Sequence, residues 1–370
     1  MANDTSLARL EHAERLLAEV ATASEAVELI DFAEAARVYA QQAKLGTASI
    51  NHAQVVKLRA ERRLADVVDQ GQARGEIATQ KDNTRPASSP PEEALPLTVP
   101  SKPAPANLSD LGVSARRIHE ARQIRDTFTD DDLEQIAAAK SKRDEEISRK
   151  RLLRVARERK TEERRKELTE QPPPKIEVGG IRLEHIDFRK AQIEPGTVDA
   201  IITDPPYPAE YLPLWSDLSE LAALWLKLDG VLISYTGQYH LPEVVRRLGE
   251  HLRYRWCGSI VMPGAGFRAH AAAIKNQSKP LLFFEKHGAK REWLADTYTS
   301  EGVEKDGHEW QQSLAVVEQI MAEATNPGDL VVDPFLGAGT TAAAAKNLGR
   351  RFIGFDVDPL AVQTASERVA

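Results

Sequence analysis

From Ile176 onward, the chain alternates short apolar runs with amphipathic stretches of helical composition. Continuous apolar runs of this length are typical of strands in a sheet that is covered on both faces. The seven runs lie at residues 181–186, 199–204, 230–237, 254–263, 279–286, 329–335 and 351–357. Between several of them, helices are predicted over residues 211–228, 241–252, 312–324 and 340–348. We therefore predict an α/β domain over residues 176–370 with a seven-stranded, mostly parallel sheet.

An all-helical region is expected to precede this domain. Residues 6–77 contain no proline and are rich in Ala, Leu, Glu and Arg, with apolar side chains at helical spacing. Breaks near Ser24, which suits a helix N-cap, and at Gly46 predict three helices. We expect residues 1–78 to form a bundle or assembly region. The Pro- and Ser-rich residues 79–106 then predict a disordered or extended linker.

Residues 107–170 are again helical in composition. Gly112 suits a tight turn and Ser114 an N-cap, so this segment favours either a DNA-reading helix-turn-helix or a plain helical hairpin. In the first alternative, Arg116 and Arg117 lie on a recognition helix over Ala115–Arg125.

The basic stretch from Lys140 to Lys166 is predicted to continue as one long helix. It holds 13 Lys and Arg against 6 Asp and Glu, a charge of +7, so the remainder of the chain sums to −14 within the total of −7. Its apolar residues, too few for a fully buried stripe, are Ile147, Leu152, Leu153 and Val155. The helix is expected to be a solvated or coiled-coil connector, or to contact nucleic-acid phosphates. The prolines of residues 171–175 indicate a boundary.

The composition limits the kinds of protein and site. The 370 residues are 28% charged and 42% hydrophobic, an ordinary profile for a soluble protein. With one cysteine, Cys257, the chain can form no intramolecular disulfide and no cysteine-rich zinc site, and no metal is expected. No apolar run reaches the length of a membrane span. These features indicate a cytoplasmic protein without a membrane partner.

One motif ends the run at residues 199–204 with Asp204-Pro205-Pro206-Tyr207. Two prolines end a strand because they lack backbone N–H groups and fix φ. Ligands of open α/β sheets bind beyond the carboxyl ends of the strands, where this motif is expected. Asp204 and the Pro205 carbonyl can accept both hydrogens of an exocyclic amine, and Tyr207 can stack on a planar base. The alternative is a turn that only ends the strand.

A second motif follows the run at residues 329–335. Gly337 and Gly339 precede a helix predicted from Thr340, so the backbone there can approach a ligand closely at a helix N-terminus. The next strand ends in Asp356, seventeen positions beyond Gly339, where nucleotide-binding α/β units place an acid against ribose hydroxyls. Because Ala342 stands at the position of a third glycine, the pattern favours an adenosyl ligand over a dinucleotide.

Together, the two motifs closely resemble those of the amino-group DNA methyltransferases that use S-adenosylmethionine, the adenine-N6 and cytosine-N4 type. Their order resembles the permuted beta arrangement, and the segments NQSKP and HEWQQS resemble its phage and prophage branch. The resemblance covers residues 176–370 and implies a Rossmann-like methyltransferase sheet, S-adenosylmethionine as cofactor and DNA as partner. It also implies DNA methylation, as in restriction–modification, by a nucleoid-associated or phage-encoded protein.

The resemblance assigns roles to individual residues. The clamp for the target base corresponds to Asp204, Pro205, Pro206 and Tyr207. The expected cofactor-binding residues are Asp187, His308, Asp333, Phe335, Gly337, Gly339, Thr340 and Asp356. For Asp187 a helix N-cap is the alternative, and for Phe335 core packing. His308 falls where relatives carry a His…Lys-Pro element, but Gln312 and Ser313 replace Lys-Pro here, so the cation for the cofactor carboxylate is missing.

The resemblance favours adenine over cytosine as the target, because Asp-Pro-Pro-Tyr is more frequent in the adenine type. The segment between Phe284 and His308 is too short for the target-recognition region that relatives insert. Contacts to DNA are therefore expected from the N-terminal half, at Arg116 and Arg117, from a loop that carries Arg268, Lys275 and Lys279, or from a partner. A solvated surface loop is the alternative for that segment. The N-terminal helices suit a homodimer. A different alternative is a DNA-binding regulator whose methyltransferase domain is vestigial.

Overall fold

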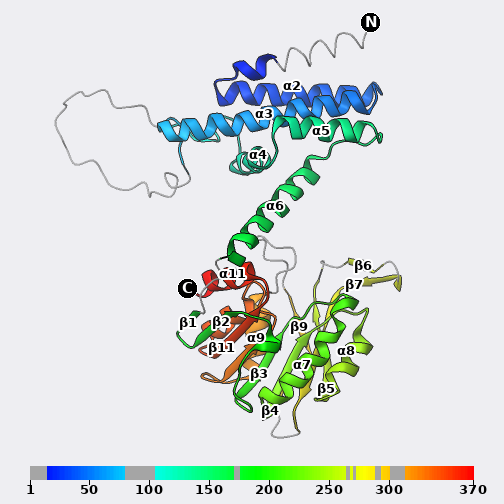
Figure 1. Ribbon diagram of the computed structural model, residues 1–370, viewed down its shortest axis with the longest axis vertical. Coiled ribbons are helices and arrows are strands. Elements are labelled where there is room, and N and C mark those ends of the chain that lie inside the picture. The colour runs from blue at the N-terminus through cyan, green and yellow to red at the C-terminus, as the bar shows by residue number, and fades with distance from the viewer. Residues whose placement is uncertain are drawn as a thin grey trace, which may run out of the picture. The chain divides into compact units, whose positions relative to one another are not determined.

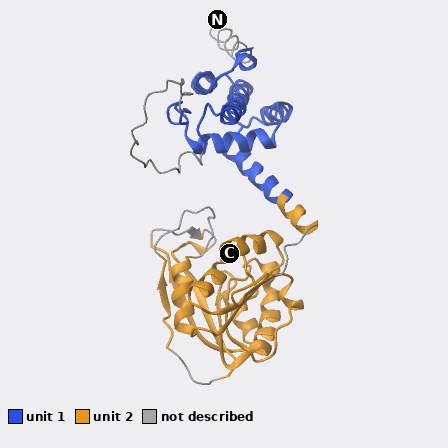
Figure 2. Ribbon diagram, turned by 90° about the vertical axis from the view of Figure 1, so that its left-hand side faces the viewer, with its two compact units in different colours: residues 1–163 blue, residues 164–370 orange. Residues whose placement is uncertain are grey.

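The computed structural model describes residues 15–79, 105–170, 176–263, 267–269, 272–287, 293–300 and 313–370. The chain divides into two compact units, residues 1–163 and 164–370 (Figure 2). The division falls within helix α6 (Arg149–Glu170). Most of the predicted linker, as well as the proline boundary at residues 171–175, lies outside the described residues. No helix in the described part of the chain is long and apolar enough to cross a membrane.

The first unit is helical, as predicted. Its elements are α2 (Ala23–Gln42), α3 (Thr47–Arg74), α4 (Ala115–Thr127), α5 (Asp130–Ser141) and the start of α6 (Figure 1). Helix α2 is capped by Thr22, whose hydroxyl accepts from the N–H of Glu25 while the Glu25 carboxylate accepts from the N–H of Thr22. The predicted cap at Ser24 is wrong, because this capping box places Ser24 inside the helix.

The prediction of one long basic helix from Lys140 is also wrong. Helix α5 ends at Ser141 and α6 begins at Arg149, with Asp144 at φ +55° between them. The intervening turn is held by Asn51 of α3, which is 1% exposed. Its amide donates to the carbonyl of Glu145 at 3.0 Å and accepts from the N–H of Ile147 at 2.8 Å. The turn buries Ile147 together with Leu152 and Leu153, so these apolar residues form a cluster instead of a sparse exposed face.

The first helix of the predicted helix-turn-helix is absent from the described residues. Residues 108–112 form turns, and Leu108 and Leu111 pack on the apolar cluster of α2 and α3. The predicted turn at Gly112 and N-cap at Ser114 are confirmed, since Gly112 has φ +68° and the Ser114 hydroxyl accepts from the N–H of Arg117 at the start of α4. The prolines upstream leave too little chain for a helix before Gly112.

The second unit is built on one mixed sheet. Its order is β1-β2-β11-β10-β3-β4-β8-β5-β9, a total of nine strands among the described residues. Most neighbouring pairs are parallel, but β8 is antiparallel to both β4 and β5, and β1 is antiparallel to β2. The strands are β1 (Ile176–Val178), β2 (Ile181–His185), β3 (Val198–Thr203), β4 (Leu226–Tyr235), β5 (Arg253–Val261), β8 (Ser278–Glu285), β9 (Thr297–Thr299), β10 (Leu330–Asp333) and β11 (Arg351–Asp356).

All seven predicted strands are present. The predicted number of seven strands is wrong, because the sheet has two further short strands at its edges. These are β1 and β9, each of three residues, which are too short to show a hydrophobic pattern of their own. A separate two-stranded hairpin is formed by β6 (Phe267–Ala269) and β7 (Ile274–Asn276).

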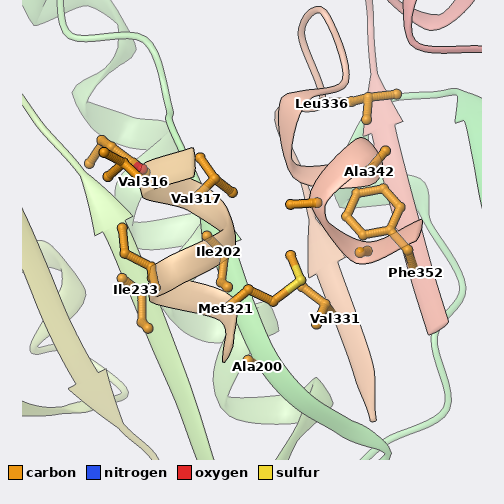
Figure 3. Close-up of a cluster of buried hydrophobic side chains, with 14 of the residues drawn as sticks. Ala200, Ile202, Ile233, Val316, Val317, Met321, Val331, Leu336, Ala342 and Phe352 are labelled. Atoms are coloured by element: carbon orange, nitrogen blue, oxygen red, sulfur yellow. The ribbon is translucent and has the colours of Figure 1, made fainter. Parts of the chain in front are cut away.

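Helices cover both faces of the sheet. The helices α7 (Leu212–Trp225) and α8 (Leu241–Leu248) contribute to one apolar cluster, and α9 (Leu314–Ala324), α10 (Thr340–Asn347) and α11 (Pro359–Val369) contribute to the other. Along β3, Ile201 belongs to the first cluster and its neighbours Ala200 and Ile202 to the second, because alternate side chains of a strand point to opposite faces. Figure 3 shows Ile202 close to Met321 of α9 in the second cluster.

Candidate active site

The two sequence motifs end neighbouring parallel strands. Strand β3 leads to Asp204 and β10 ends in Asp333, and the register pairs Ala200 with Val331. Parallel strands of this register carry their carboxyl ends to the same edge of the sheet. The Thr203 hydroxyl donates a 2.7 Å hydrogen bond to Oδ1 of Asp333, so the two strand ends are joined directly.

At the end of β3, both carboxylate oxygens of Asp204 have partners. The hydroxyl of Tyr207 donates to Oδ1, and Nζ of Lys279 donates to Oδ2 at 2.8 Å. Burial and the nearby Asp204 carboxylate raise the pKa of Tyr207, so its phenol stays protonated as a donor. Gly237 lies against this ring, since a Cβ at that position would be 3.3 Å from its Cβ, Cγ and Cδ2 atoms. Pro205 is buried and Pro206 is partly buried.

From the sequence, Lys279 belongs with the cations expected to contact DNA phosphates, and no motif connects it with Asp204. Lys279 is the second residue of β8, whose antiparallel direction brings its beginning to the edge where β3 and β4 end. Its Nζ lies 5.0 Å from the ring centroid of Tyr207 and 4.9 Å from that of Tyr235. The order of the strands could have revealed this neighbour, but the sequence alone does not supply that order.

On the other side of β3, a glycine loop joins β10 to α10. Gly337 has φ +50° and Gly339 φ +77°, both in the left-handed region. A Cβ on Gly339 would lie 2.6 Å from Cβ of Ala365 in α11, so a side chain is excluded there by packing as well.

The carboxylate of Asp356 lies at the end of β11 beside this loop. It accepts from the N–H of Gly337 at 2.8 Å and from the N–H of Asp358 at 2.9 Å. Burial raises the pKa of Asp356 in spite of these two donors. Further donors, such as ligand hydroxyls, would therefore stabilise the ionised carboxylate.

Asp333 is buried, at 3% exposure, and is a second carboxylate with a perturbed pKa. Burial raises its pKa to about 6, although the Thr203 hydroxyl and the N–H of Phe335 donate to it. The Phe335 ring packs on Phe188 with the ring centroids 5.0 Å apart. This contact is the core packing that was the alternative for Phe335.

Thr340 begins α10 and is itself partnered. Nη1 of Arg368 in α11 donates to its hydroxyl at 3.0 Å. This contact places the Arg368 guanidinium at the start of α10. No sequence motif links Arg368 to Thr340, so the sequence alone does not reveal it.

The remaining predicted residues fall in different places. Asp187 caps the 3₁₀ helix η2 (Phe188–Lys190), accepts from the N–H of Arg189 at 3.0 Å and pairs with its guanidinium at 2.6 Å. The hydrogen bond from the Arg189 side chain holds the pKa of Asp187 below its usual range. This is the N-cap that was the alternative for Asp187. His308 lies outside the described residues.

Apart from Lys279, the predicted DNA-contact residues lie in two places. Arg268 and Lys275 are Cα partners in the register of the β6–β7 hairpin, and Lys275 is exposed. In the first unit, the Arg116 side chain is 86% exposed and pairs with Glu120, and Arg117 lies 3.9 Å from Asp31.

Part of the second unit is similar to known DNA methylases. Residues 198–367 match the N6/N4 family model described as DNA methylase. The Type II methyltransferase M2.DpnII of Streptococcus pneumoniae is 42% identical over 62 residues, which are 17% of this chain and 23% of that protein. The Type II methyltransferase M2.LlaDCHI of Lactococcus lactis subsp. cremoris is 39% identical over 62 residues, with the same shares of 17% and 23%. The chain thus matches under a quarter of the length of these curated relatives.

Two solved structures each cover about half of the chain. The M1.HpyAVI–SAM complex has 27% identity and a TM-score of 0.43, covering 51% of this chain and 98% of that chain. The PvuII DNA methyltransferase, described as cytosine-N4-specific, has 16% identity and a TM-score of 0.47, covering 51% of this chain and 86% of that chain.

Proposed function

We propose that this chain methylates the N6 amine of an adenine in DNA, with S-adenosylmethionine as the methyl donor. The match of residues 198–367 to the N6/N4 family model described as DNA methylase supports this proposal. The observation that carries the proposal is the hydrogen bond from Thr203 to Asp333. It joins the strand that leads to the amine clamp to the strand that leads to the glycine loop. The group that donates the methyl and the amine that receives it can thereby meet at one edge of the sheet.

The residues around the glycine loop suit the cofactor. The Asp356 carboxylate accepts from backbone N–H groups, but burial still raises its pKa, so it suits the ribose hydroxyls as further donors. The buried carboxylate of Asp333 suits the positive charge of the methionine portion. Gly337 and Gly339 leave the backbone accessible at the start of α10. When bound, S-adenosylmethionine supplies an activated methyl group on a sulfonium. Asp187, Phe335, Thr340 and His308 complete the proposed set.

Asp204 and Pro205 act on the amine. The lone pair of an exocyclic amine is delocalised into the base ring, which makes the nitrogen a poor nucleophile. If the Asp204 carboxylate and the Pro205 carbonyl accept its two hydrogens, the nitrogen becomes more tetrahedral and its lone pair becomes available. Asp204 does not have to remove a proton first, because the methylated ammonium loses one readily. The contribution of these residues is placement and a fixed dipole.

Tyr207 and Pro206 hold the base itself. A base inside a duplex cannot reach the clamp, so the nucleotide has to leave the helix, at a cost of a few kcal/mol. Stacking of the extruded base on Tyr207 offsets part of this cost, by about 1–3 kcal/mol. Pro206 keeps the corner between Asp204 and Tyr207 rigid.

The base and the partners belong to the same proposal. Adenine is favoured because the clamp has Asp in its first position, and cytosine-N4 is the second candidate. Cations for DNA phosphates come from two places. One is the β6–β7 hairpin, with Arg268 and the exposed Lys275, and the other is α4, with Arg116 and Arg117. The first unit supplies the surface for a homodimer.

Single-molecule sequencing of host DNA tests the proposal. DNA would be prepared from cells that express the wild-type chain, Asp204→Ala or no protein. N6-methyladenine at a recurring short sequence is expected only with the wild-type chain. N4-methylcytosine at such a sequence would overturn the choice of base. Identical DNA in the three samples, with the protein shown to be folded, would overturn the activity and favour a DNA-binding regulator.

A further inference from the structure

Lys279 lies in the place that the proposed function reserves for the target base. Its ammonium is 2.8 Å from Oδ2 of Asp204 and lies over the rings of Tyr207 and Tyr235, at 5.0 and 4.9 Å. The carboxylate and the first of these rings are the two groups assigned to the amine and to the base. An ammonium bound in this way is itself a nitrogen that donates hydrogen to Asp204.

The direction from which Lys279 arrives supports this placement. In the sheet, β10 and β11 lie on one side of β3, and β4 and β8 lie on the other. The glycine loop and Asp356 follow β10 and β11, whereas Lys279 comes from β8. The lysine therefore reaches Asp204 from the side opposite to the proposed cofactor residues, which is the side left for the nucleotide.

The pair of Lys279 and Asp204 is suited to being displaced. Their side chains are 24% and 25% exposed. Because water screens an ion pair that is this accessible, the pair changes the equilibrium between its formed and broken states by only about two- to fivefold. The flexible four-carbon stem of lysine allows the ammonium to move without a change in the backbone.

A second observation indicates that a polar group is missing from this place. The hydroxyl of Tyr235 is buried and has no hydrogen-bond partner among the described residues. A buried hydroxyl without a hydrogen-bond partner is unfavourable, so a polar ligand group that accepts from Tyr235 would stabilise the site. The burial that isolates this hydroxyl, together with Asp204 and Asp333, also raises the pKa of Tyr235, which therefore stays a neutral donor.

We propose that Lys279 is a positioning residue that takes the place of the target amine in the free protein and withdraws when a nucleotide enters. This inference rests on the proposed function. In the free protein, the lysine keeps the Asp204 carboxylate compensated and covers Tyr207. An entering base has to break the ion pair between Lys279 and Asp204. Lys279 therefore lowers the affinity for DNA while it occupies the base site of the free protein.

Kinetics with plasmid DNA and radiolabelled S-adenosylmethionine test the proposal without knowledge of the target sequence. The full-length variants are Lys279→Met, Lys279→Arg and, as the matched control, Lys227→Met. Lys227 forms an ion pair with Asp199 near the amino end of β3, so the control removes a similar pair from the opposite end of the same strand. We expect Lys279→Met to lower KM for DNA about two- to fivefold. Lys279→Arg should raise KM, because a guanidinium can hold a carboxylate with two hydrogen bonds.

A binding measurement provides a readout that needs no methyl transfer. In Lys279→Met the Asp204 carboxylate loses its compensating charge, which favours a cationic ligand over a neutral one. Titration calorimetry should therefore show that the ratio of Kd for S-adenosylhomocysteine to Kd for S-adenosylmethionine rises about two- to fivefold in this variant and is unchanged in Lys227→Met.

The outcomes separate the two proposals. If the wild-type chain methylates no DNA, the proposed function is wrong, and the Kd ratio still decides whether Lys279 compensates Asp204. A Kd ratio equal to that of the wild type overturns the inference. An increase in KM in both Lys279 variants, or an equal loss of kcat in both at unchanged KM, also overturns it, since either result describes a lysine that supports the site without competing for it.

Discussion

The hydroxyl of Thr203 donates to the buried carboxylate of Asp333, 2.7 Å away on the neighbouring strand. Burial raises the pKa of Asp333 from 3.8 to about 6, so the folded chain binds this proton more tightly than the unfolded chain does. The stability that this proton gives the folded chain is complete when the pH is below 3.8, the pKa of Asp333 in the unfolded chain. It is lost as the pH rises through about 6, the pKa in the folded chain.

We therefore expect Asp333→Asn to gain stability relative to the wild type as the pH rises from about 4 to about 7. A shift of this size corresponds to about 3 kcal/mol in the free energy of unfolding. All five tryptophans lie beyond residue 164, so tryptophan fluorescence during denaturant unfolding follows the second unit alone. A difference in stability that does not change with pH would show that Asp333 is ionised in both states.

The Asp204→Ala substitution should abolish methyl transfer while cofactor binding remains. The carboxylate accepts from Tyr207 and Lys279 in the free protein and is proposed to hold the amine, whereas the proposed acceptor for the cofactor ribose is Asp356, beside the glycine loop. A loss of at least about a hundredfold in kcat is expected. Titration calorimetry with S-adenosylmethionine provides the control. Activity equal to the wild type would refute the role of Asp204.

The opposite pattern is expected for Asp356. Its substitution by Ala removes the acceptor for two backbone N–H groups and for the proposed ribose hydroxyls, so the affinity for S-adenosylmethionine should fall about 10- to 100-fold. Asp356→Asn keeps one carbonyl oxygen and should lie between the alanine variant and the wild type. Unchanged cofactor affinity in both variants would remove Asp356 from the cofactor site.

Gly339 should tolerate no side chain. In Gly339→Ala the new Cβ would lie 2.6 Å from Cβ of Ala365, and the residue would also be held at φ +77°. Gly349 is the matched control, because it has φ +70° and no atom within 4 Å of the added Cβ. The free energy of unfolding should fall by about 1 kcal/mol in Gly349→Ala and by about 2–4 kcal/mol in Gly339→Ala. Equal losses would mean that α11 moves aside easily.

The proposed homodimer can be tested on α2. Phe32 and Tyr39 are large apolar residues of this helix that are 38% and 43% exposed. If they pair with a second copy, size-exclusion chromatography with light scattering should show a dimer for the wild type. A Phe32→Glu, Tyr39→Glu variant should then be a monomer, because burying two charges at an apolar contact is unfavourable. A wild-type monomer at high concentration would contradict the dimer.

The sequence predicted the strands well, because each of the seven long strands is marked by its own run of apolar residues. It missed β1 and β9, whose three residues each are held by pairing with a neighbouring strand. It also missed the end of α5, since the stretch around Asp144 is helical in composition. The backbone groups of that turn are satisfied by Asn51, which lies some ninety residues away in sequence. Local propensity cannot report such a partner.

The chain's own order of residues determined which strands form, where Asp204-Pro205-Pro206-Tyr207 interrupts one of them, and where glycines precede a helix. These features depend on the conformational limits of proline and glycine and on the spacing of apolar side chains, which act over a few neighbouring residues. Only the tertiary structure decided that Thr203 meets Asp333 and that Lys279 meets Asp204. Both contacts depend on which strands lie side by side, and that order results from packing of the whole sheet.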